Sequence, residues 1–311
     1  YQWIVRLNAF LDVSVDDIGQ IGGGKRKPTG IIDVATIQSL GRKGVVDDIV
    51  AQYGHLVVDE CHHISARSFE IVARQCKAKY VIGLSATVTR KDGHHPIIFM
   101  NCGPVRYQVD DKKQAAARPF EHKVIVRETN FRMPASFEAD RYTAIHEIYK
   151  ALLQSDERNQ VIVADVMNAI KNNRFPLILT ERKEHLEALK SMLENKIQNL
   201  IVMKGGMGKK QRQAALNALE SLPDHAEKAL LATGRYLGEG FDDERLDTLI
   251  LTLPISWRGT LSQYAGRLHR IYDMKKEVII YDYADLGVPM LERMYERRLR
   301  GYRAIGYEIE Q

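Results

Sequence analysis

The sequence predicts an α/β protein made of two parallel-sheet domains that a helical segment joins. Short apolar runs ending in polar or small residues alternate with stretches of helical periodicity, which is the pattern of parallel strands covered by helices. The chain has 311 residues, of which 45% are hydrophobic, and this is enough apolar material for two cores. The alternation is interrupted once, by a charged and helix-rich stretch, and this interruption separates the two domains.

The first domain is expected over residues 1–110, and apolar runs predict its strands. These runs are IIDVAT at 31–36, HLVVDE at 55–60 and KYVIGLSAT at 79–87. Before them, apolar residues recur at the spacing of an amphipathic helix, namely Trp3, Leu7, Phe10 and Leu11. Because the chain begins inside this helical pattern and not with Met, we expect an N-terminal truncation that leaves the first domain incomplete.

Residues 111–174 are expected to form a connector and helical insertion, or the start of the second domain. Two apolar stripes at helical spacing support this expectation. One consists of Tyr142, Ile145, Tyr149 and Leu152, and the other of Ile162, Val166 and Ile170. Charged residues surround both stripes, as on helices that expose one side.

The second domain is expected over residues 175–311, where the alternation returns. Its strands are predicted at PLILT (176–180), NLIVM (199–203), ALLAT (229–233), DTLILTLP (247–254) and EVIIYDY (277–283). The chain closes on a helix whose apolar face holds Leu291, Met294, Tyr295, Leu299 and Tyr302. The arginines of this helix are expected on a solvated basic side, and they are Arg293, Arg297, Arg298, Arg300 and Arg303.

Composition excludes several classes of protein. No apolar run approaches the roughly 18 residues of a membrane span, so an integral membrane protein is excluded. The cysteines Cys61, Cys76 and Cys102 are odd in number and form no CxxC pair, so neither a disulfide framework nor a zinc ribbon is indicated, and a cytoplasmic location is expected. The net charge of +5 permits an anionic partner without establishing one.

Two adjacent carboxylates, Asp59 and Glu60, follow the apolar run that ends at Val58. Open α/β sheets bind ligands at the carboxyl ends of their strands, so these groups are candidates for a magnesium nucleotide site. The aspartate would hold the cation, and the glutamate would accept a proton from the water that attacks the γ-phosphate. The alternative is that both residues only cap the following helix. His62 follows them on the turn.

Two further stretches place polar groups after predicted strands. Ser85 and Thr87 end the next apolar run, and their hydroxyls are candidates for linking the carboxylates to another lobe. GEGFD at 238–242 places two glycines and Asp242 after the ALLAT strand, which suits close approach of the backbone to a phosphate or a sugar. Taken alone, this glycine cluster is equally typical of a plain turn.

The stretch QYAGRLHR at 263–270 is the most informative in the chain. On a helix of about 100° per residue, Gln263, Arg267 and Arg270 fall within roughly 60° of each other. The opposite side then holds Leu261, Tyr264, Leu268 and Ile271. Two guanidinium groups aimed together match the oxygens of a phosphate. The alternative is the solvated face of an amphipathic helix.

Six stretches in this order resemble the motifs of superfamily 2 helicases. They are VATIQSL (34–40), VVDECHH (57–63), LSAT (84–87), LILTERKEHLEAL (177–189), ATGRYLGEGFD (232–242) and QYAGRLHR (263–270). Their forms resemble the DEAD/DEAH-like DNA translocases of the XPB, UvrB and restriction-motor branches more than the RNA DEAD-box proteins. The resemblance covers nearly the whole chain. It implies two RecA-like domains, the first incomplete here, that hydrolyse ATP between them with Mg²⁺ and act on DNA, with RNA as the alternative.

By position in these motifs, the resemblance also implies a role for each candidate residue. Asp59 would bind Mg²⁺, Glu60 would activate the water, and Arg267 and Arg270 would be arginine fingers. The remaining candidates are Asp242, Gly240 and Gln263 at the nucleotide, Ser85, Thr87 and His62 in coupling hydrolysis to domain movement, and Thr36, Gln38, Thr180, Arg182, Thr233 and Gly234 at the phosphates of the nucleic acid.

The sequence departs from this family at the phosphate-binding loop. No GxxxxGK[ST] stretch occurs in the 311 residues. GGGK at 22–25 is followed by Arg26 and is expected to be a basic hairpin tip, while in GGMGKK at 205–210 a lysine takes the place of the hydroxyl. Since the missing loop supplies most of the phosphate recognition, we expect little or no ATPase activity from this chain alone, with an upstream domain or a partner subunit supplying the loop.

Two other functions compete with an ATP-driven motor. A metal-dependent nuclease would take its ligands from Asp59, Glu60, His62, His63, His94, His95 and Cys102. Adjacent side chains point in different directions, however, and no HExxH or CxxC pattern supports a closed site. The second competitor is a non-catalytic, helicase-like module that binds nucleic acid or a partner protein, because a degenerate chain would also lack the loop. The retained Arg267 and Arg270 argue against it.

Overall fold

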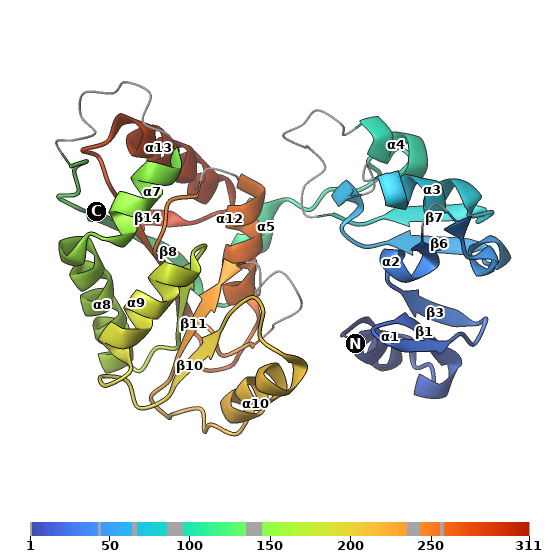
Figure 1. The fold of residues 1–311 in the computed structure, drawn as a ribbon, viewed down its shortest axis with the longest axis horizontal. Helices are drawn as coiled ribbons and strands as arrows, with labels where there is room; N and C mark the ends of the chain where they lie inside the picture. Colours follow the sequence, from blue (N-terminus) through green and yellow to red (C-terminus); the bar gives the residue numbers. More distant parts are fainter. Residues whose placement is uncertain are drawn as a thin grey trace. The chain divides into compact units, whose positions relative to one another are not determined.

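The computed structural model describes residues 2–42, 45–63, 67–85, 96–134, 145–234, 243–255 and 258–310. The chain divides into two compact units, Tyr1–Gln108 (unit 1) and Val109–Gln311 (unit 2), and Figure 1 labels many of their elements. Within the described residues, no helix is both long and apolar enough to cross a bilayer.

Unit 1 contains short elements. They are α1 (Gln2–Leu11), η1 (Val15–Asp17), β1 (Ile18–Gly22), β2 (Lys25–Lys27), β3 (Ile32–Ala35), α2 (Ile37–Leu40), β4 (Gly41–Arg42), β5 (Val45–Val46), η2 (Asp48–Gln52), β6 (His55–Val58), η3 (Cys61–His63), α3 (Arg67–Gln75), β7 (Tyr80–Gly83) and α4 (Pro96–Cys102), where η denotes a 3₁₀-helix. The strands form three small sheets, β2-β1-β3, β4-β5 and β6-β7. The amphipathic helix and the three strands predicted for this unit are therefore present.

The GGGK stretch is the tip of the β1–β2 hairpin, as predicted. The strands are antiparallel, with Gly22 opposite Lys25. Gly23 and Gly24 form the turn with φ angles of 63° and 85°, which glycine adopts without the steric cost of a Cβ atom. This glycine stretch is thus accounted for by the hairpin.

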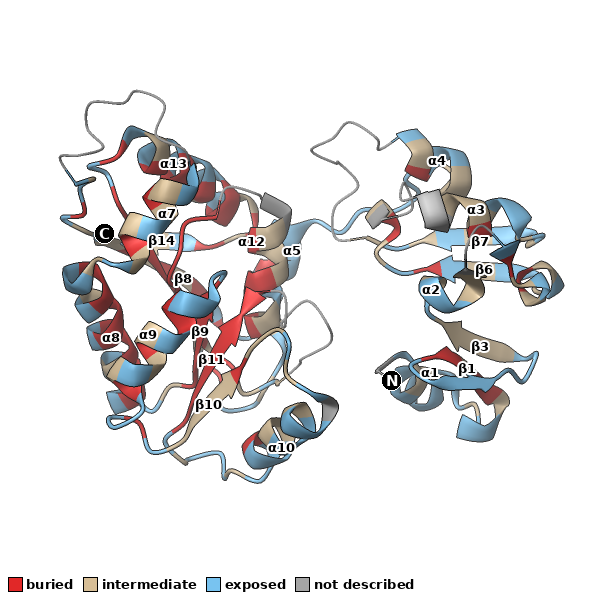
Figure 2. Ribbon diagram, viewed as in Figure 1, coloured by how far each residue is buried: buried red, intermediate tan, exposed pale blue. Residues whose placement is uncertain are grey.

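The parallel pair β6-β7 is poorly covered. Its buried contacts come from a small cluster of Val58, Cys61 and Ile98. Val57 is 47% exposed, and Ile82 is 45% exposed, so much of the pair is pale blue in Figure 2. Parallel strands usually have both faces covered. In the described part of unit 1, one face of this pair is open.

Unit 2 is built on a seven-stranded parallel sheet of order β10-β11-β9-β12-β13-β8-β14. Its strands are β8 (Glu121–Glu128), β9 (Pro176–Thr180), β10 (Leu200–Met203), β11 (Ala229–Thr233), β12 (Thr248–Leu251), β13 (Glu277–Ala284) and β14 (Glu308–Glu310). Its helices are α5 (Asp111–Ala116), α7 (Ile145–Leu153), α8 (Asp156–Lys171), α9 (Lys183–Leu193), α10 (Lys209–Glu220), α12 (Arg258–Ala265), η4 (Gly266–His269) and α13 (Pro289–Ala304). The predicted α/β fold with a parallel sheet is confirmed.

Helices cover both faces of this sheet. One core joins α8 and α9 to it through residues such as Ile162, Leu186 and Leu189. The other joins α12 and α13 to the opposite face through residues such as Leu261 and Tyr302. The central strands β9, β11 and β12 are buried along their whole length, which Figure 2 shows in red.

The segment 111–174 contains a strand as well as the expected helices. Its residues belong to unit 2, and β8 pairs with β13 over eight positions from Glu121 to Glu128. The sequence prediction of a connector and helical insertion did not include this strand. Charged residues occupy both exposed positions and two of the three intermediate positions of β8, and they hide its apolar alternation. The predicted stripe of α8 is buried, with Ile162 and Val166 at 0% exposure.

The final helix α13 differs from the prediction at one arginine. Its apolar face packs as expected, but Arg298 is only 3% exposed. The guanidinium Nε donates to Asp282 Oδ2 at 2.8 Å, and Nη2 donates to Asp282 Oδ1 at 2.9 Å. The expectation of a solvated side was therefore wrong for Arg298, because helix periodicity does not reveal a carboxylate buried on β13.

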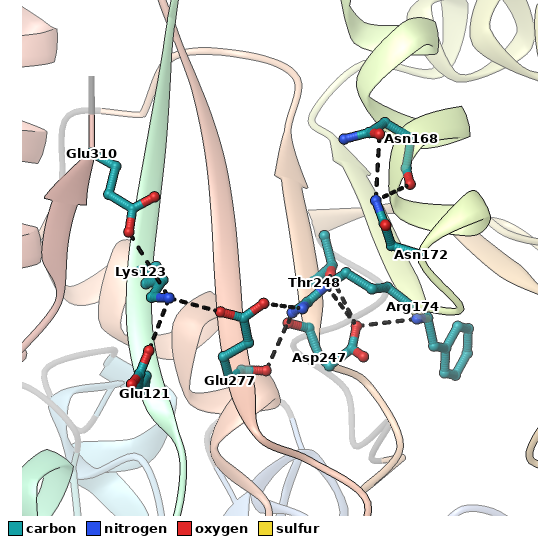
Figure 3. Close-up of polar contacts among 10 residues, drawn as sticks. Glu121, Lys123, Asn168, Asn172, Arg174, Asp247, Thr248, Glu277 and Glu310 are labelled. Carbon is teal, nitrogen blue, oxygen red and sulfur yellow. Dashed lines mark hydrogen bonds and ion pairs between the residues drawn. The ribbon is translucent and has the colours of Figure 1, made fainter.

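The amino ends of the strands are closed by a polar network (Figure 3). Arg174, which precedes β9, donates to Thr248 Oγ1 at 2.6 Å and to Glu277 Oε1 at 2.8 Å. Lys123 on β8 lies 3.0 Å from the other oxygen of Glu277. Burial raises the pKa of Asp247 beside Arg174. This edge is occupied by contacts within the unit, whereas most of the predicted site residues follow the opposite ends of the strands.

Candidate functional site

In unit 1, β6 delivers Asp59 and Glu60 to the carboxyl end of a parallel pair. Asp59 is exposed, and its Oδ1 accepts a hydrogen bond from the Glu60 amide at 2.9 Å. The other oxygen, Oδ2, accepts from Trp3 Nε1 of α1, also at 2.9 Å. Glu60 has a φ of 49°, a left-handed conformation that is uncommon for a residue with a side chain. Such conformations persist where the surrounding structure enforces them, often at functional sites.

His62 connects this turn to the end of β7. Its Nδ1 lies 3.1 Å from Glu60 Oε2 and 2.9 Å from Ser85 Oγ. The backbone fixes the arrangement, because the Cys61 amide donates to Leu84 O and the Leu84 amide donates to Val58 O, both at 2.8 Å. The structure therefore brings Glu60, His62 and Ser85 together.

The donor set around Asp59 is compatible with Mg²⁺ only in combination with other ligands. Among the described residues, no group of three or more His, Cys, Asp or Glu side chains is arranged to hold a metal ion. Mg²⁺ at nucleotide sites typically takes one or two carboxylates, waters and the phosphates themselves. The exposed Asp59 carboxylate fits this role, since each of its oxygens accepts one hydrogen bond and keeps a lone pair. His94 and His95 of the nuclease hypothesis lie outside the described residues.

The other candidates in unit 1 lie at the start of α2. Thr36 and Gln38 are exposed. Thr36 Oγ1 lies 2.8 Å from Ser39 Oγ, and the Thr36 amide donates to Ile21 O at 3.0 Å. Both side chains can be reached by a ligand from solvent.

In unit 2, three of the predicted motifs meet at the carboxyl edge of the sheet. Tyr264 of α12 donates to Glu181 Oε1 at 2.5 Å, directly after β9. Gly234, directly after β11, packs so closely that a Cβ atom there would overlap Glu181 and the Tyr264 hydroxyl. Burial, together with the Glu181 carboxylate, raises the pKa of Tyr264. The glycine is required because the three segments leave no room for a side chain.

Two of the predicted nucleic-acid contacts are buried. Thr180 is 1% exposed, and its hydroxyl lies 3.1 Å from Nδ1 of the buried His185. Thr233 is 6% exposed, and its Oγ1 accepts from the Gly205 amide at 3.0 Å. Both hydroxyls make hydrogen-bond contacts inside unit 2. Neither side chain is therefore presented to a nucleic-acid strand, contrary to expectation. Gly234 is also buried.

Arg182 is the exposed one of the four predicted nucleic-acid contacts in unit 2. Its guanidinium lies over the Tyr149 ring, 5.7 Å from the centroid, and the Tyr149 hydroxyl donates to Pro254 O at 2.6 Å. Arg182 and Tyr149 line an open groove of about 560 Å³ between α7 and α9, together with His146, Lys150, Leu153, Gln154, Glu184 and Ala188. The lining contains two cationic side chains, Lys150 and Arg182, and one anionic side chain, Glu184. The two cations are able to contact a phosphate.

The QYAGRLHR segment is only partly the helix that was predicted. The α-helix α12 ends at Ala265, and Gly266–His269 continue as the 3₁₀-helix η4. Arg270 follows η4 with an extended backbone, so helical spacing does not fix its direction relative to Gln263 and Arg267. Leu261, Tyr264 and Leu268 are buried as expected, but Ile271 is 66% exposed, contrary to expectation. Gln263 and Arg267 are half-buried, and Arg270 is exposed.

Three predicted site residues lie outside the described residues. They are Thr87, Gly240 and Asp242. Sequence reasoning also missed contacts that the structure contains, among them Trp3 to Asp59 and Tyr264 to Glu181. Both join segments far apart in the chain, so no local pattern could have indicated them, although each involves a residue next to or within a predicted motif.

Two family models match the chain. The model described as type III restriction enzyme, res subunit, matches residues 1–90, and the model described as helicase conserved C-terminal domain matches residues 149–272. A DNA 3'-5' helicase XPB of Kineococcus radiotolerans is 25% identical over 279 residues, which covers 87% of this chain and 47% of that protein. A relative from Acanthamoeba polyphaga mimivirus is 24% identical over 281 residues, with coverage of 89% and 52%. The chain thus spans about half the length of these relatives.

Solved structures share the fold at low sequence identity. The Saccharomyces cerevisiae protein Dbp5, bound to RNA and ADP BeF3, matches with a TM-score of 0.63 and 13% identity over 99% of this chain and 73% of that chain. The type ISP restriction-modification enzyme LlaBIII, bound to DNA, matches with a TM-score of 0.59 and 14% identity over 92% of this chain and 23% of that chain. The motifs and the two family-model matches agree, and the chain belongs to the superfamily 2 helicases.

Proposed function

We propose that this protein is a nucleic-acid-dependent ATPase motor, a DNA helicase or duplex translocase. The observation that carries the proposal is the convergence of Glu60, His62 and Ser85 at the ends of β6 and β7, with His62 Nδ1 within 3.1 Å of both partners. A carboxylate held beside an imidazole ring and a hydroxyl is suited to receive a proton from water. A change at Glu60 would then reach Ser85, at the end of β7, through His62.

Each charged group then has a defined task. Glu60 accepts the proton of the attacking water. Mg²⁺, when bound, would be held by Asp59 and the phosphates, where it neutralises charge that develops during transfer. Arg267 and Arg270 bind the γ-phosphate oxygens, and Gln263 lies one turn earlier on the same segment. An arginine in such a role contributes about 10³- to 10⁵-fold in rate where the role is established. We place Gly240 and Asp242 at the ribose and phosphates on the basis of the motif alone.

The proposed partner is DNA, and RNA is the alternative. The XPB relatives are named as a DNA helicase and a DNA translocase, whereas the name of the mimivirus relative designates an RNA helicase. The groove between α7 and α9 supports a nucleic-acid role, because Arg182 and Lys150 can contact phosphates. Thr36 and Gln38 are the exposed candidates of unit 1.

The 311 residues contain no GxxxxGK[ST] stretch, the sequence pattern of the phosphate-binding loop. We propose that the natural, longer protein or a partner subunit supplies it, so the 311-residue chain alone hydrolyses ATP slowly or not at all. The test compares DNA-stimulated ATP turnover by this chain, by the longer protein and by its Glu60→Gln variant. We expect turnover only by the longer protein, and a loss of about 10²- to 10⁴-fold on Glu60→Gln.

A matched control is Glu70→Gln on α3. Glu70 pairs with Arg74 at 2.6 Å, on the same helix, so this change removes one carboxylate from unit 1 without touching the turn after β6. If the 311-residue chain itself hydrolyses ATP and Glu60→Gln abolishes this turnover, the proposed inactivity of the 311-residue chain is contradicted. A longer protein that binds DNA without any turnover would instead favour the non-catalytic binding module.

A further inference from the structure

Lys275, in the loop between η4 and β13, is a buried cation that the proposed chemistry does not use. It is only 7% exposed. Its ammonium Nζ donates to Leu268 O and to Arg270 O, both at 2.9 Å. It also lies 5.5 Å from the centroid of the Phe120 ring, where a cation interacts favourably with the π-face. One ammonium group therefore holds two carbonyl oxygens on either side of His269.

The two carbonyls belong to the turn that follows Arg267 and contains Arg270. A 3₁₀-helix has poorer hydrogen-bond geometry than an α-helix, and its last carbonyls have no partner within the helix. Lysine near the end of a helix satisfies such carbonyls and interacts favourably with their dipoles. Lys275 thus replaces the hydrogen bonds that a continuing α-helix would have supplied after Ala265.

The same turn is held from a second side. His269 Nε2 lies 2.8 Å from the Tyr307 hydroxyl, and the His122 ring packs against both of these rings at centroid distances of 5.1 and 5.2 Å. Burial lowers the pKa of His269 to about 3, so its ring is neutral near pH 7. The backbone of 268–270 is therefore fixed from two sides. The Lys275 ammonium binds its carbonyl oxygens, and the Tyr307 hydroxyl contacts the His269 side chain.

We propose that Lys275 is a positioning residue that fixes the turn after α12 so that Arg267 and Arg270 reach the nucleotide together. The proposal rests on the proposed function, since it assigns the geometry of the two arginines to Lys275. The physical reason is that guanidinium groups on a loose turn would lose the pre-organised placement on which electrostatic stabilisation depends. A displacement of about 1 Å can cost about 10²-fold in rate.

The charge of Lys275 gives a second readout. Burial lowers its pKa to about 8, opposed by the carboxylates of Asp247, Asp243 and Glu244 and assisted by the charge of Arg174. The group is charged below that pH and neutral above it. Turnover should therefore decline as pH rises through about 8, if the charged ammonium holds the carbonyls. An arginine in its place stays charged throughout this range.

The test uses the longer protein with Lys275→Met, Lys275→Arg and the control Lys276→Met, whose side chain is exposed. For Lys275→Met we expect faster hydrogen exchange at the amides of 266–271 with unchanged exchange in β9. We expect kcat to fall about 10²-fold with little change in KM, because the arginines act on the transition state. Lys275→Arg should keep most of the activity and lose the decline above pH 8.

The outcomes separate this inference from the proposed function. If the longer protein hydrolyses no ATP, the proposed function fails. Unchanged hydrogen exchange at 266–271 in Lys275→Met would then also overturn the proposal that Lys275 fixes this turn. If ATP is hydrolysed and kcat is retained in Lys275→Met, the positioning role is overturned even where exchange increases. If Lys275→Met does not fold, the pH profile of Lys275→Arg decides, and a decline identical to that of the unmodified protein overturns the proposal.

Discussion

The two units contain parallel strands with similar sequences but very different surroundings. In unit 2, β9 and β11 are buried at every position, and helices cover both faces of the sheet. In unit 1, β6 and β7 pair in parallel as well, yet Val57 and Ile82 are nearly half exposed. An apolar run therefore predicts a strand, and the number of elements packed on that strand decides whether it is buried.

The two parts of the proposed site therefore differ in how well the surrounding fold supports them. The turn with Asp59 and Glu60 lies on the thinly covered pair, whereas the seven-stranded sheet supports the QYAGRLHR segment with a continuous core. Regions with few buried apolar contacts open more easily than well-packed ones. We expect the carboxylate turn to be the less rigid of the two, and the following predictions test this comparison.

The largest effect is expected when the units are produced separately. Residues 109–311 should unfold cooperatively in urea with a free energy of about 5–15 kcal/mol, as ordinary domains do. Residues 1–108 should unfold without a sharp transition and bind a hydrophobic dye, because their small sheets leave apolar side chains in water. Circular dichroism and dye fluorescence across a urea series provide the measurement. Cooperative unfolding of residues 1–108 at a similar urea midpoint would remove the contrast.

The second prediction concerns a buried ion pair that anchors α8 to the sheet of unit 2. Arg158 Nε donates to Asp285 Oδ1 at 2.8 Å, and Nη1 donates to Thr252 O at 2.8 Å. The two side chains are 1% and 0% exposed. Arg158→Met should reduce the free energy of unfolding by about 3–5 kcal/mol, because it leaves the Asp285 charge buried without its partner.

The matched control is an ion pair at the surface of the same unit. Lys190 and Glu194 on α9 lie 3.4 Å apart with side chains 43% and 44% exposed. Lys190→Met should change the free energy of unfolding by no more than about 0.5 kcal/mol, since solvent screens exposed pairs. Equal losses in the two variants, measured by urea unfolding of the same chain, would show that burial does not govern these pairs.

The sequence predicted the elements better than it predicted their contacts. PLILT and ALLAT are continuous apolar runs and became β9 and β11. The strand β8 was missed because EHKVIVRE places charges at both ends of a short apolar stretch. Arg298 was assigned to solvent because its partner Asp282 lies on another element. Periodicity describes a segment, whereas pairing depends on the fold.

The candidate site follows the same rule. Ser85 was predicted only as a candidate for linking the carboxylates to another lobe, and in the structure its hydroxyl lies 2.9 Å from His62 Nδ1, which also contacts Glu60. The common direction of Arg267 and Arg270 was derived from an ideal helix, and the change to a 3₁₀-helix at Gly266 removed its basis. No sequence pattern indicated that Lys275 is buried, since a lysine in a charged loop resembles any surface lysine.

The last comparison truncates one apolar residue on a strand of each unit, and the smallest effect is expected in unit 1. Leu179 of β9 is 1% exposed, and Leu179→Ala should reduce the free energy of unfolding of unit 2 by about 2–5 kcal/mol through lost burial and a cavity. Val57 of β6 is 47% exposed, so Val57→Ala should cost about 0.5 kcal/mol or less, as surface substitutions do. Urea unfolding of the whole chain, with one probe in each unit, measures both. A loss at Val57 as large as that at Leu179 would mean that the open face of β6 and β7 is covered in solution.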